Sequence, residues 1–396
     1  MKKISILLIS AALFLAACSE PVDMAENDEE SGVTNVPVTE QEEQVTSRTE
    51  NRTDYQTVIP YQISPSRGLT STNMVSSYNI EAFEKGLFDI SKEVFSPDDY
   101  IFREGQIFTE EMVRGFLNRT YTREEIDEMT EEELADGTAF SNLGLNPSTG
   151  GETDPDVIAE EAPLYLSHLL EQNYVVEDEN GDMQLEGMTI GLAMNSVYYY
   201  ENDDGSTESV SLDAATVKEE GEQMAEEILE RIRANEQYQD ITITFAIFIQ
   251  SNDTSIAPGN FVSYSVADAG EGELSSFTNV NEQNVLFPSS EAEELSEETN
   301  NDYQLFNRNL SSYFDSFTTS VGQGYFKDGN LEHLSIEIPV EYTSRGEIIG
   351  LSQYVSDLLS NHFAGVRVEI SIADKSDTYA LITKTSDGNI QTHIYE

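Results

Sequence analysis

The order of secondary-structure elements predicted for the second half of the chain limits the possible folds more than any other feature. A strand, a helix and two further strands are predicted over 188–200, 213–232, 241–250 and 261–268, and the same order returns over 333–342, 344–359, 366–372 and 378–384. We therefore expect two β-α-β-β units, the first with a linker helix over 186–330 and the second over 331–396. Hairpin signals such as Ser386-Asp387-Gly388 favour antiparallel or mixed sheets covered by helices.

Side-chain periodicity supports these elements. Apolar residues alternate in the strand patterns, as in Ile241, Ile243, Phe245, Ile247 and Ile249. The second helix begins at a capping-box pattern, Ser344 with Glu347, and Gly365 follows it as a stop that tolerates the left-handed conformation. The linker helix is predicted from apolar residues at helical spacing: Tyr303, Phe306, Leu310, Tyr313 and Phe317.

The first half, over 53–185, is predicted to be mainly helical. One helix is indicated by Ile80, Phe83, Leu87, Ile90 and Val94. Capping boxes are predicted at Thr122 with Glu125 and at Thr130 with Glu133. A further helix before Tyr174 is indicated by Leu164, Leu166, Leu169 and Leu170. The expected fold class is α+β, with a helical N-terminal part followed by two β-α-β-β units that form antiparallel or mixed sheets covered by helices.

The N-terminus has the layout of a secretory leader. Lys2 and Lys3 give a positive start, and the apolar run that follows, to Ala17, is too short to span a bilayer as a permanent helix. The run ends in Leu15-Ala16-Ala17-Cys18, which fits the lipobox of bacterial lipoproteins. We therefore expect residues 1–17 to be a signal peptide that is cleaved between Ala17 and Cys18.

Cys18 is the expected lipidation site. Its thiol would take a diacylglyceryl group, and the small residues Ala16 and Ala17 would let a peptidase reach the bond before it. Cys18 is the single cysteine of the chain, so it has no disulfide partner and leaves no thiol for catalysis. The expected partners are a lipid anchor, a prolipoprotein acyltransferase and a signal peptidase. The expected location is the extracytoplasmic face of the cell membrane.

Acidic residues dominate the composition. The chain has 75 acidic and 20 basic residues and a formal charge of −55, which excludes a nucleic-acid partner because such binding needs Lys and Arg. Residues 18–52 are acidic and almost free of large apolar side chains, so we expect a disordered tether there. The 38% apolar content is enough for a folded body. The excess of acidic residues on its surface suggests the hypothesis that the protein comes from a high-salt habitat.

No recognised catalytic pattern emerges from the sequence. The four histidines, His168, His333, His362 and His393, are not at metal-ligand spacing, although His333 and His393 in predicted strands could meet across a sheet. His362 lies near the end of a predicted helix, and this position favours an interaction with the helix dipole over a role as a metal ligand. Asp178 to Asp182 resembles the start of a calcium loop but also fits a tight turn. We therefore expect no enzyme, no metal and no cofactor.

Two arginines are candidate ligand-binding residues. Arg67 and Arg345 each stand in a Ser-Arg-Gly step within an acidic background. A guanidinium group can bind a carboxylate ligand in bidentate fashion. Ion pairing with the abundant acidic residues is the alternative.

Several stretches resemble the CamS sex-pheromone lipoproteins of Gram-positive bacteria. They are YQTVIPYQISPSRGL (55–69), GLFDISKEVFSPDDYIFREGQIF (86–108), GLAMNSVYYY (191–200), NVLFPS (284–289) and LSIEIPVEYTSRGEIIGLSQYV (334–355). The resemblance implies an extracytoplasmic lipoprotein with a mixed α/β body and no established catalytic residues. It also implies release of a short apolar peptide from the leader, sensed by a receptor in cells that carry a responsive plasmid. The corresponding residues here are Ala11, Ala12, Leu13, Phe14, Leu15, Ala16 and Ala17.

The sequence is compatible with three roles for the folded body that follows the leader and tether. The first is a binding or adhesion module of unknown ligand behind a pheromone-precursor leader. The second is a cell-envelope enzyme that uses paired carboxylates, which would need a pocket with carboxylates of perturbed pKa. The third is a solute-binding lipoprotein with two lobes facing a cleft. A structure can separate these roles.

Overall fold

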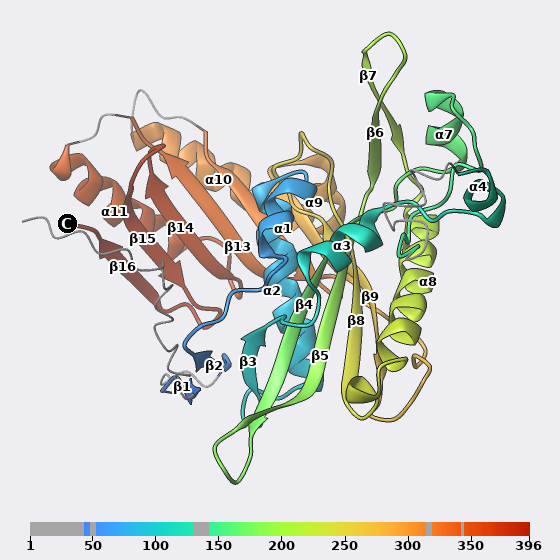
Figure 1. Ribbon diagram of the computed structural model, residues 1–396. Helices are drawn as coiled ribbons and strands as arrows, with labels where there is room; N and C mark the ends of the chain where they lie inside the picture. Colours follow the sequence, from blue (N-terminus) through green and yellow to red (C-terminus); the bar gives the residue numbers. More distant parts are fainter. Residues whose placement is uncertain (1–42, 48–52, 130–141, 314–318, 342–343) are drawn as a thin grey trace, which may run out of the picture. The chain divides into compact units, whose positions relative to one another are not determined.

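The computed structural model describes residues 43–47, 53–129, 142–313, 319–341 and 344–396 (Figure 1). Residues 43–396 form one compact unit. The predicted signal peptide, its candidate peptide over 11–17, the lipidation site Cys18 and most of the predicted tether lie outside the described residues.

The described strands form an eight-stranded sheet, a six-stranded sheet and a two-stranded hairpin. The eight-stranded sheet has the order β1 (Gln44–Val45), β2 (Gln56–Ile59), β3 (Ile101–Glu104), β4 (Leu166–Glu177), β5 (Met183–Met194), β8 (Thr242–Ile249), β9 (Asn260–Ala267), β10 (Thr278–Asn279). The six-stranded sheet has the order β11 (Glu282–Phe287), β12 (Val321–Lys327), β13 (Asn330–Pro339), β14 (Arg367–Ala373), β15 (Thr378–Lys384), β16 (Ile390–Ile394). The hairpin pairs β6 (Val197–Glu201) with β7 (Thr207–Ser211).

Helices cover these sheets. The described helices are α1 (Arg67–Asn73), α2 (Ser77–Val94), α3 (Glu110–Leu117), α4 (Arg123–Glu128), α7 (Pro155–Glu161), α8 (Ala214–Arg233), α9 (Ser290–Leu295), α10 (Glu297–Tyr313) and α11 (Arg345–Leu359), with a short 3-10 helix over Glu236–Tyr238. Several begin at the residues that the sequence indicates. Two of the predicted capping boxes, Thr122 with Glu125 and Ser344 with Glu347, are formed. The third, Thr130 with Glu133, lies outside the described residues.

The predicted repeat of element order is confirmed, with one correction. The single strand predicted over 188–200 ends at Met194, and residues 197–201 form β6 of the hairpin that stands between β5 and α8. In the first unit, β5 and β8 are parallel neighbours joined through α8, and β8 pairs with β9 in antiparallel fashion. In the second unit, β13 and β14 are parallel neighbours joined through α11, and β14 pairs with β15 in antiparallel fashion. Both sheets are therefore mixed, and the α+β class holds.

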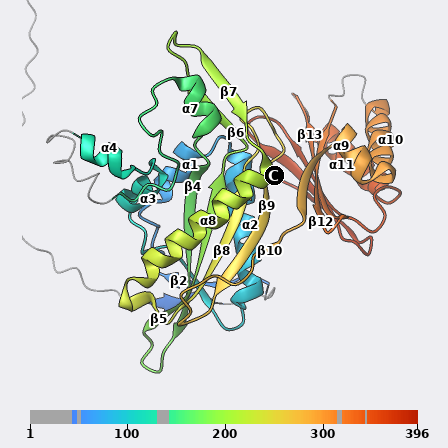
Figure 2. The same cartoon turned by 90° about the vertical axis from the view of Figure 1, so that its right-hand side faces the viewer.

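Opposite faces of the eight-stranded sheet are covered by α8 and α2 (Figure 2). One face packs Ile190 and Leu192 of β5 against Ile228 of α8. The other packs Ala193 of β5 against Phe83 of α2. Adjacent strand residues point to opposite faces, so a central strand buried on both sides is apolar throughout.

The six-stranded sheet has helices on one face. Its apolar residues, which include Leu334, Ile336 and Val368, pack with Phe306 of α10 and Val355 of α11 in one buried cluster. Most of the intervening strand residues are polar or charged, with Val321 of β12 as an apolar exception, and they point to the opposite face. That polar face lies beside α2 and holds the candidate site.

The prediction of a mainly helical part over 53–185 is wrong for its last segment. Leu166, Leu169 and Leu170 lie in strand β4, which pairs with β3 on one side and β5 on the other. Nearly every residue of β4 is at least half-buried. Its sequence therefore lacks the alternation of apolar and polar residues that marks a strand with one solvent-exposed face. Leucines on both faces of the strand imitate helical spacing.

The predicted tether also reaches too far along the chain. Gln44 and Val45 form β1, which pairs with β2 in antiparallel fashion. The backbone N–H of Thr57 donates to Oγ1 of Thr46 over 2.9 Å, and Thr46 N–H donates to the Thr57 carbonyl over 3.0 Å. These backbone partners lie on the exposed edge of β2. The amino-acid composition of residues 18–52 cannot predict that part of the segment pairs with such an edge.

Among the described residues, no helix is both long and apolar enough to cross a lipid bilayer.

Candidate functional site

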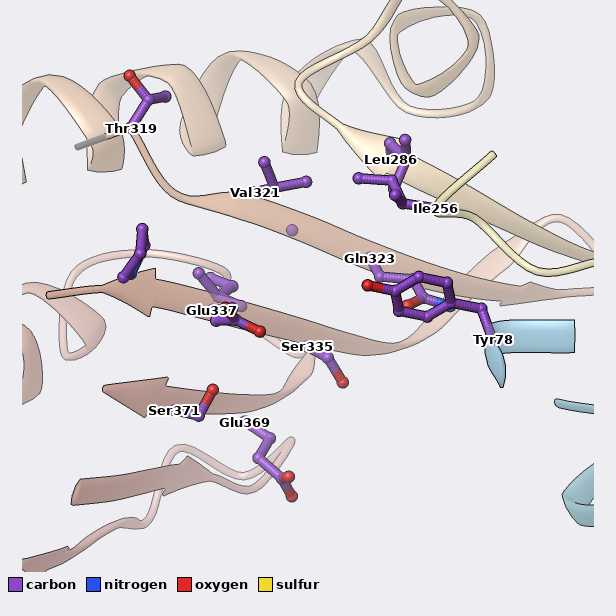
Figure 3. A pocket seen from close by; sticks show the side chains of 13 residues that line it. Tyr78, Ile256, Leu286, Thr319, Val321, Gln323, Ser335, Glu337, Glu369 and Ser371 are labelled. Carbon is purple, nitrogen blue, oxygen red and sulfur yellow. The ribbon is translucent and has the colours of Figure 1, made fainter. Parts of the chain in front are cut away.

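A cleft lies between helix α2 and the polar face of the six-stranded sheet. It consists of two adjoining cavities of about 440 and 320 Å³, which share Tyr78, Gln323, Ser335 and Glu369 in their walls. Figure 3 shows the side chains around the smaller cavity. Both volumes fall in the range of small-molecule pockets. We refer to the two cavities together as the α2 cleft.

Helix α2 forms one wall because it is amphipathic. Its apolar side, with Phe83 and Leu87, is buried against the eight-stranded sheet. Its other side presents residues three or four positions apart to the cleft, namely Tyr78, Glu81, Lys85 and Asp89. This spacing places them along one stripe of the helix.

The opposite wall consists of cross-strand rows on the six-stranded sheet. Tyr325 of β12 stands opposite His333 of β13, which in turn stands opposite Arg367 of β14. The next row is formed by Gln323, Ser335 and Glu369. The parallel pairing of β13 with β14 therefore brings together polar residues that are more than 30 positions apart in the sequence.

Two cations of the cleft have no ionic partner. Among the described residues, neither Lys85 nor Arg367 forms an ion pair, although the chain carries 75 acidic and only 20 basic residues. Both act on the same group, because each lowers the pKa of His333 through its charge. The cleft thus contains two positive charges that are free to meet a ligand.

His333 is held neutral at physiological pH. Burial, followed by the charges of Lys85 and Arg367, lowers the pKa of its imidazole to about 4. Its buried Nε2 atom has no hydrogen-bond partner among the described residues. A neutral imidazole can offer one donor and one acceptor, so His333 can hydrogen-bond a ligand without adding charge.

Some carboxylates of the cleft have partners of their own. Asp89 pairs with Lys92 over 3.3 Å, and Glu282 lies 3.9 Å from Lys327. Burial raises the pKa of Glu282, and burial together with Glu282 raises the pKa of the neighbouring Tyr325. These acidic groups are therefore partly neutralised within the protein.

Buried asparagine contacts hold the cleft walls in place. Asn79 of α2 accepts hydrogen bonds from the backbone N–H groups of Ser251 over 3.0 Å and Gly259 over 2.8 Å. This fixes the loop between β8 and β9, which carries the cleft residue Ile256. At the other wall, Asn284 of β11 donates its backbone N–H to Oδ1 of Asn260 over 2.7 Å.

The two arginines predicted from sequence lie in separate environments outside the α2 cleft. Arg67 forms an ion pair with Glu104, whose carboxylate also accepts from the Tyr61 hydroxyl over 2.6 Å. Arg67 lines a small pocket of about 150 Å³. Arg345, at the start of α11, donates to the backbone carbonyl of Tyr395. Ion pairing, the alternative raised for these residues, is thus present at Arg67.

The histidines are also dispersed. His168 is buried, and its Nε2 lies 2.9 Å from the Thr70 hydroxyl. His362 contacts the Asp302 carboxylate through Nδ1 over 2.5 Å, so a carboxylate of α10 is its nearest charged partner. His333 and His393 do not meet, because β14 and β15 separate their strands.

The calcium-like segment forms the turn between β4 and β5. The Asp178 carboxylate accepts from the backbone N–H groups of Asn180 over 2.8 Å and Asp182 over 3.0 Å. Gly181 takes a positive φ of 90°. These contacts are those of a tight turn. In the described ranges, no group of three or more His, Cys, Asp or Glu side chains could hold a metal ion.

Sequence reasoning did not identify the α2 cleft. The signal for its helical wall was present, because Tyr78, Glu81 and Lys85 recur opposite the apolar stripe. Its other wall depends on the register of β12, β13 and β14, which periodicity alone does not determine.

A family model matches this chain, and solved structures match it as well, among them the following two. The model is described as "CamS sex pheromone cAM373 precursor" and covers residues 61–389. The C-terminal domain of the sex pheromone staph-cAM373 precursor from Staphylococcus aureus is 43% identical, with a TM-score of 0.71, covering 82% of this chain and 98% of that one. A sex pheromone precursor from Lactobacillus salivarius is 29% identical, with a TM-score of 0.77, covering 89% and 99%. No curated protein matches the chain.

Proposed function

The chain belongs to the CamS sex pheromone precursor family, and on that premise we propose that it is a lipid-anchored precursor on the extracytoplasmic face of the membrane. The tail of its leader, Ala11 to Ala17, is released as a short apolar peptide. One observation carries this proposal. A positive start, an apolar run and the sequence Leu15-Ala16-Ala17-Cys18 stand in this order before a body that matches the family model.

The lipid anchor follows from the chemistry of Cys18. A prolipoprotein acyltransferase places a diacylglyceryl group on its thiol, and a signal peptidase then cuts the bond after Ala17. Two acyl chains hold a protein stably at a membrane, whereas one chain binds marginally. The cut leaves a leader whose C-terminal end is the apolar segment AALFLAA. A second cleavage before Ala11 gives the heptapeptide, whose partner is a peptide receptor in plasmid-bearing cells.

The body has a binding role in this proposal. The α2 cleft supports it, since the cleft combines ligand-sized volume with Lys85 and Arg367, two cations that form no ion pair within the described ranges. The proposal assigns no reaction to the body.

Targeted mass spectrometry of culture supernatant for AALFLAA tests peptide release. We expect the peptide together with mature protein in the membrane fraction. The Cys18→Ala variant is the control, because it blocks lipidation and should abolish both the peptide and membrane retention at mature mass. Mature lipoprotein without any heptapeptide would contradict peptide release, and membrane retention of Cys18→Ala at mature mass would contradict the anchor.

A further inference from the structure

The α2 cleft is divided into an apolar part and a charged part. The smaller cavity is lined by three large apolar side chains that are unusually exposed, Tyr78 at 47%, Ile256 at 44% and Val321 at 43%. The larger cavity is lined by Lys85 and Arg367. Because Tyr78 and three other residues belong to both cavities, a single extended ligand can occupy them together.

The charged part is suited to a carboxylate. Arg367 presents a planar guanidinium group and Lys85 an ammonium group, and both donate strong charge-assisted hydrogen bonds to carboxylate oxygens. In so acidic a chain a cation readily finds an internal acid, yet these two form no ion pair among the described residues. His333, between Tyr325 and Arg367 in its row, has a buried ring nitrogen without a hydrogen-bond partner among the described residues.

One carboxylate of the cleft, that of Glu337, defines the other end of the ligand, because it lines the smaller cavity and not the larger one that holds Lys85 and Arg367. Glu337 lines the smaller cavity and Glu369 lines both, and neither forms an ion pair among the described residues. Glu81 lies on α2, four residues before Lys85. A ligand with an amine at one end and a carboxylate at the other complements both signs of charge.

We propose that the α2 cleft binds a short apolar peptide with free ends, and that residues 11–17 of this chain are its occupant. The carboxylate of Ala17 lies at Lys85 and Arg367, the apolar side chains lie along Tyr78, Ile256 and Val321, and the amine of Ala11 lies toward Glu337. The identity of the occupant rests on the proposed release of this peptide. The seven residues AALFLAA are all apolar, so only the two ends are charged. This matches a cleft whose cations line the larger cavity and whose exposed apolar side chains line the smaller cavity together with Glu337.

Calorimetric titration of the purified mature lipoprotein, from which residues 1–17 have been removed, in detergent and with a detergent-only titration subtracted, tests this assignment. The probes are synthetic AALFLAA with free ends and the same peptide with a C-terminal amide. We expect saturable one-to-one binding of the free peptide and roughly tenfold weaker binding of the amide, because the amide loses a charge-assisted contact.

Cleft variants locate the contact. Arg367→Gln and Lys85→Gln should each weaken binding of the free peptide by roughly tenfold and leave binding of the amide unchanged. Lys375→Gln is the matched control, since Lys375 is exposed and lies outside the cleft. Tyr78→Ala should weaken the binding of both peptides to a similar extent.

Three results would overturn the assignment: no saturable binding, equal affinity for the free acid and the amide, or an unchanged affinity in both cation variants. The peptide is synthetic, so these results do not depend on its release by cells. Detection of AALFLAA in culture without binding would retain the proposed function and remove only the role of the cleft.

Discussion

At the scale of single residues, the buried His168 ties stability to pH. Burial lowers the pKa of its imidazole to about 4 from a usual value of 6.5. Between these values the unfolded chain binds a proton that the folded chain does not, so stability falls as pH decreases from 6.5 toward 4 and the loss is complete below pH 4. The full loss corresponds to at most about 3 kcal/mol.

The contribution of His168 can be isolated by comparing two variants with the parent chain. Urea unfolding at several pH values between 7 and 4 should show that His168→Gln loses less stability than the parent on acidification. Titration of the many carboxylates is common to both proteins and cancels in the difference. His393→Gln, at an exposed position of β16, should retain the parent slope. Parallel curves for His168→Gln and the parent would disprove this role of His168.

Asn79 is a second residue whose removal has a defined cost. Its side chain is fully buried and accepts from the N–H groups of Ser251 and Gly259. Asn79→Ala leaves these donors unsatisfied, and we expect a loss of about 2–3 kcal/mol in the free energy of unfolding. Urea unfolding measures it, with the exposed Asn361→Ala as control. A loss no larger than that of Asn361→Ala would show that water replaces the asparagine.

At the scale of elements, the capping box of α11 stabilises the start of the second unit's helix. Ser344 accepts from the Glu347 N–H, and the Glu347 carboxylate accepts from the Ser344 N–H over 2.6 Å. Ser344→Ala should cost about 1 kcal/mol in thermal or urea unfolding. Ser360→Ala, at the exposed C-terminal end of the same helix, is the control and should be close to neutral. Equal costs for the two variants would contradict a specific capping role.

An element with one solvent-facing side is the easier one to predict, although β5 and β8, which are buried on both faces, also read as strands in the sequence. Helix α8 has Val217, Met224 and Ile228 buried, with exposed residues between them, so its pattern was recognised in the sequence. Strand β4 is buried on both faces, so Leu166 and Leu169 were misread as helical. The repeat was predictable because most of its elements have one polar side.

The candidate site was less predictable than the elements that build it. Arg67 and Arg345 stood out because both occur in a Ser-Arg-Gly step, but a shared tripeptide carries no information about spatial neighbours. Arg367 and His333 face each other only through the parallel register of β13 and β14. Lys85 reaches them from a helix of the other half of the chain. Such juxtapositions depend on how distant segments pack and not on local periodicity.

At the scale of the whole molecule, the formal charge of −55 governs the response to salt. Like charges repel one another in the compact state, and added salt shortens the range of that repulsion from about 10 Å at 0.1 M to about 3 Å at 1 M. We therefore expect the melting temperature, measured by differential scanning calorimetry, to rise with NaCl up to molar concentration. A flat response would remove the hypothesis that this surface suits high salt.

A charge-reduced variant separates screening from the general effect of salt on apolar burial. Helix α8 carries four exposed glutamates, of which Glu227 pairs with Arg231, while Glu219, Glu226 and Glu230 form no ion pair with another described residue. Replacement of these last three by glutamine should raise the melting temperature at 0.1 M NaCl and reduce its further rise toward 1 M, because less repulsion remains to be screened. Sucrose strengthens apolar burial without screening charge, so it should raise the melting temperatures of both proteins equally. If NaCl also raises the melting temperatures of both proteins equally, self-repulsion does not limit the stability of this chain.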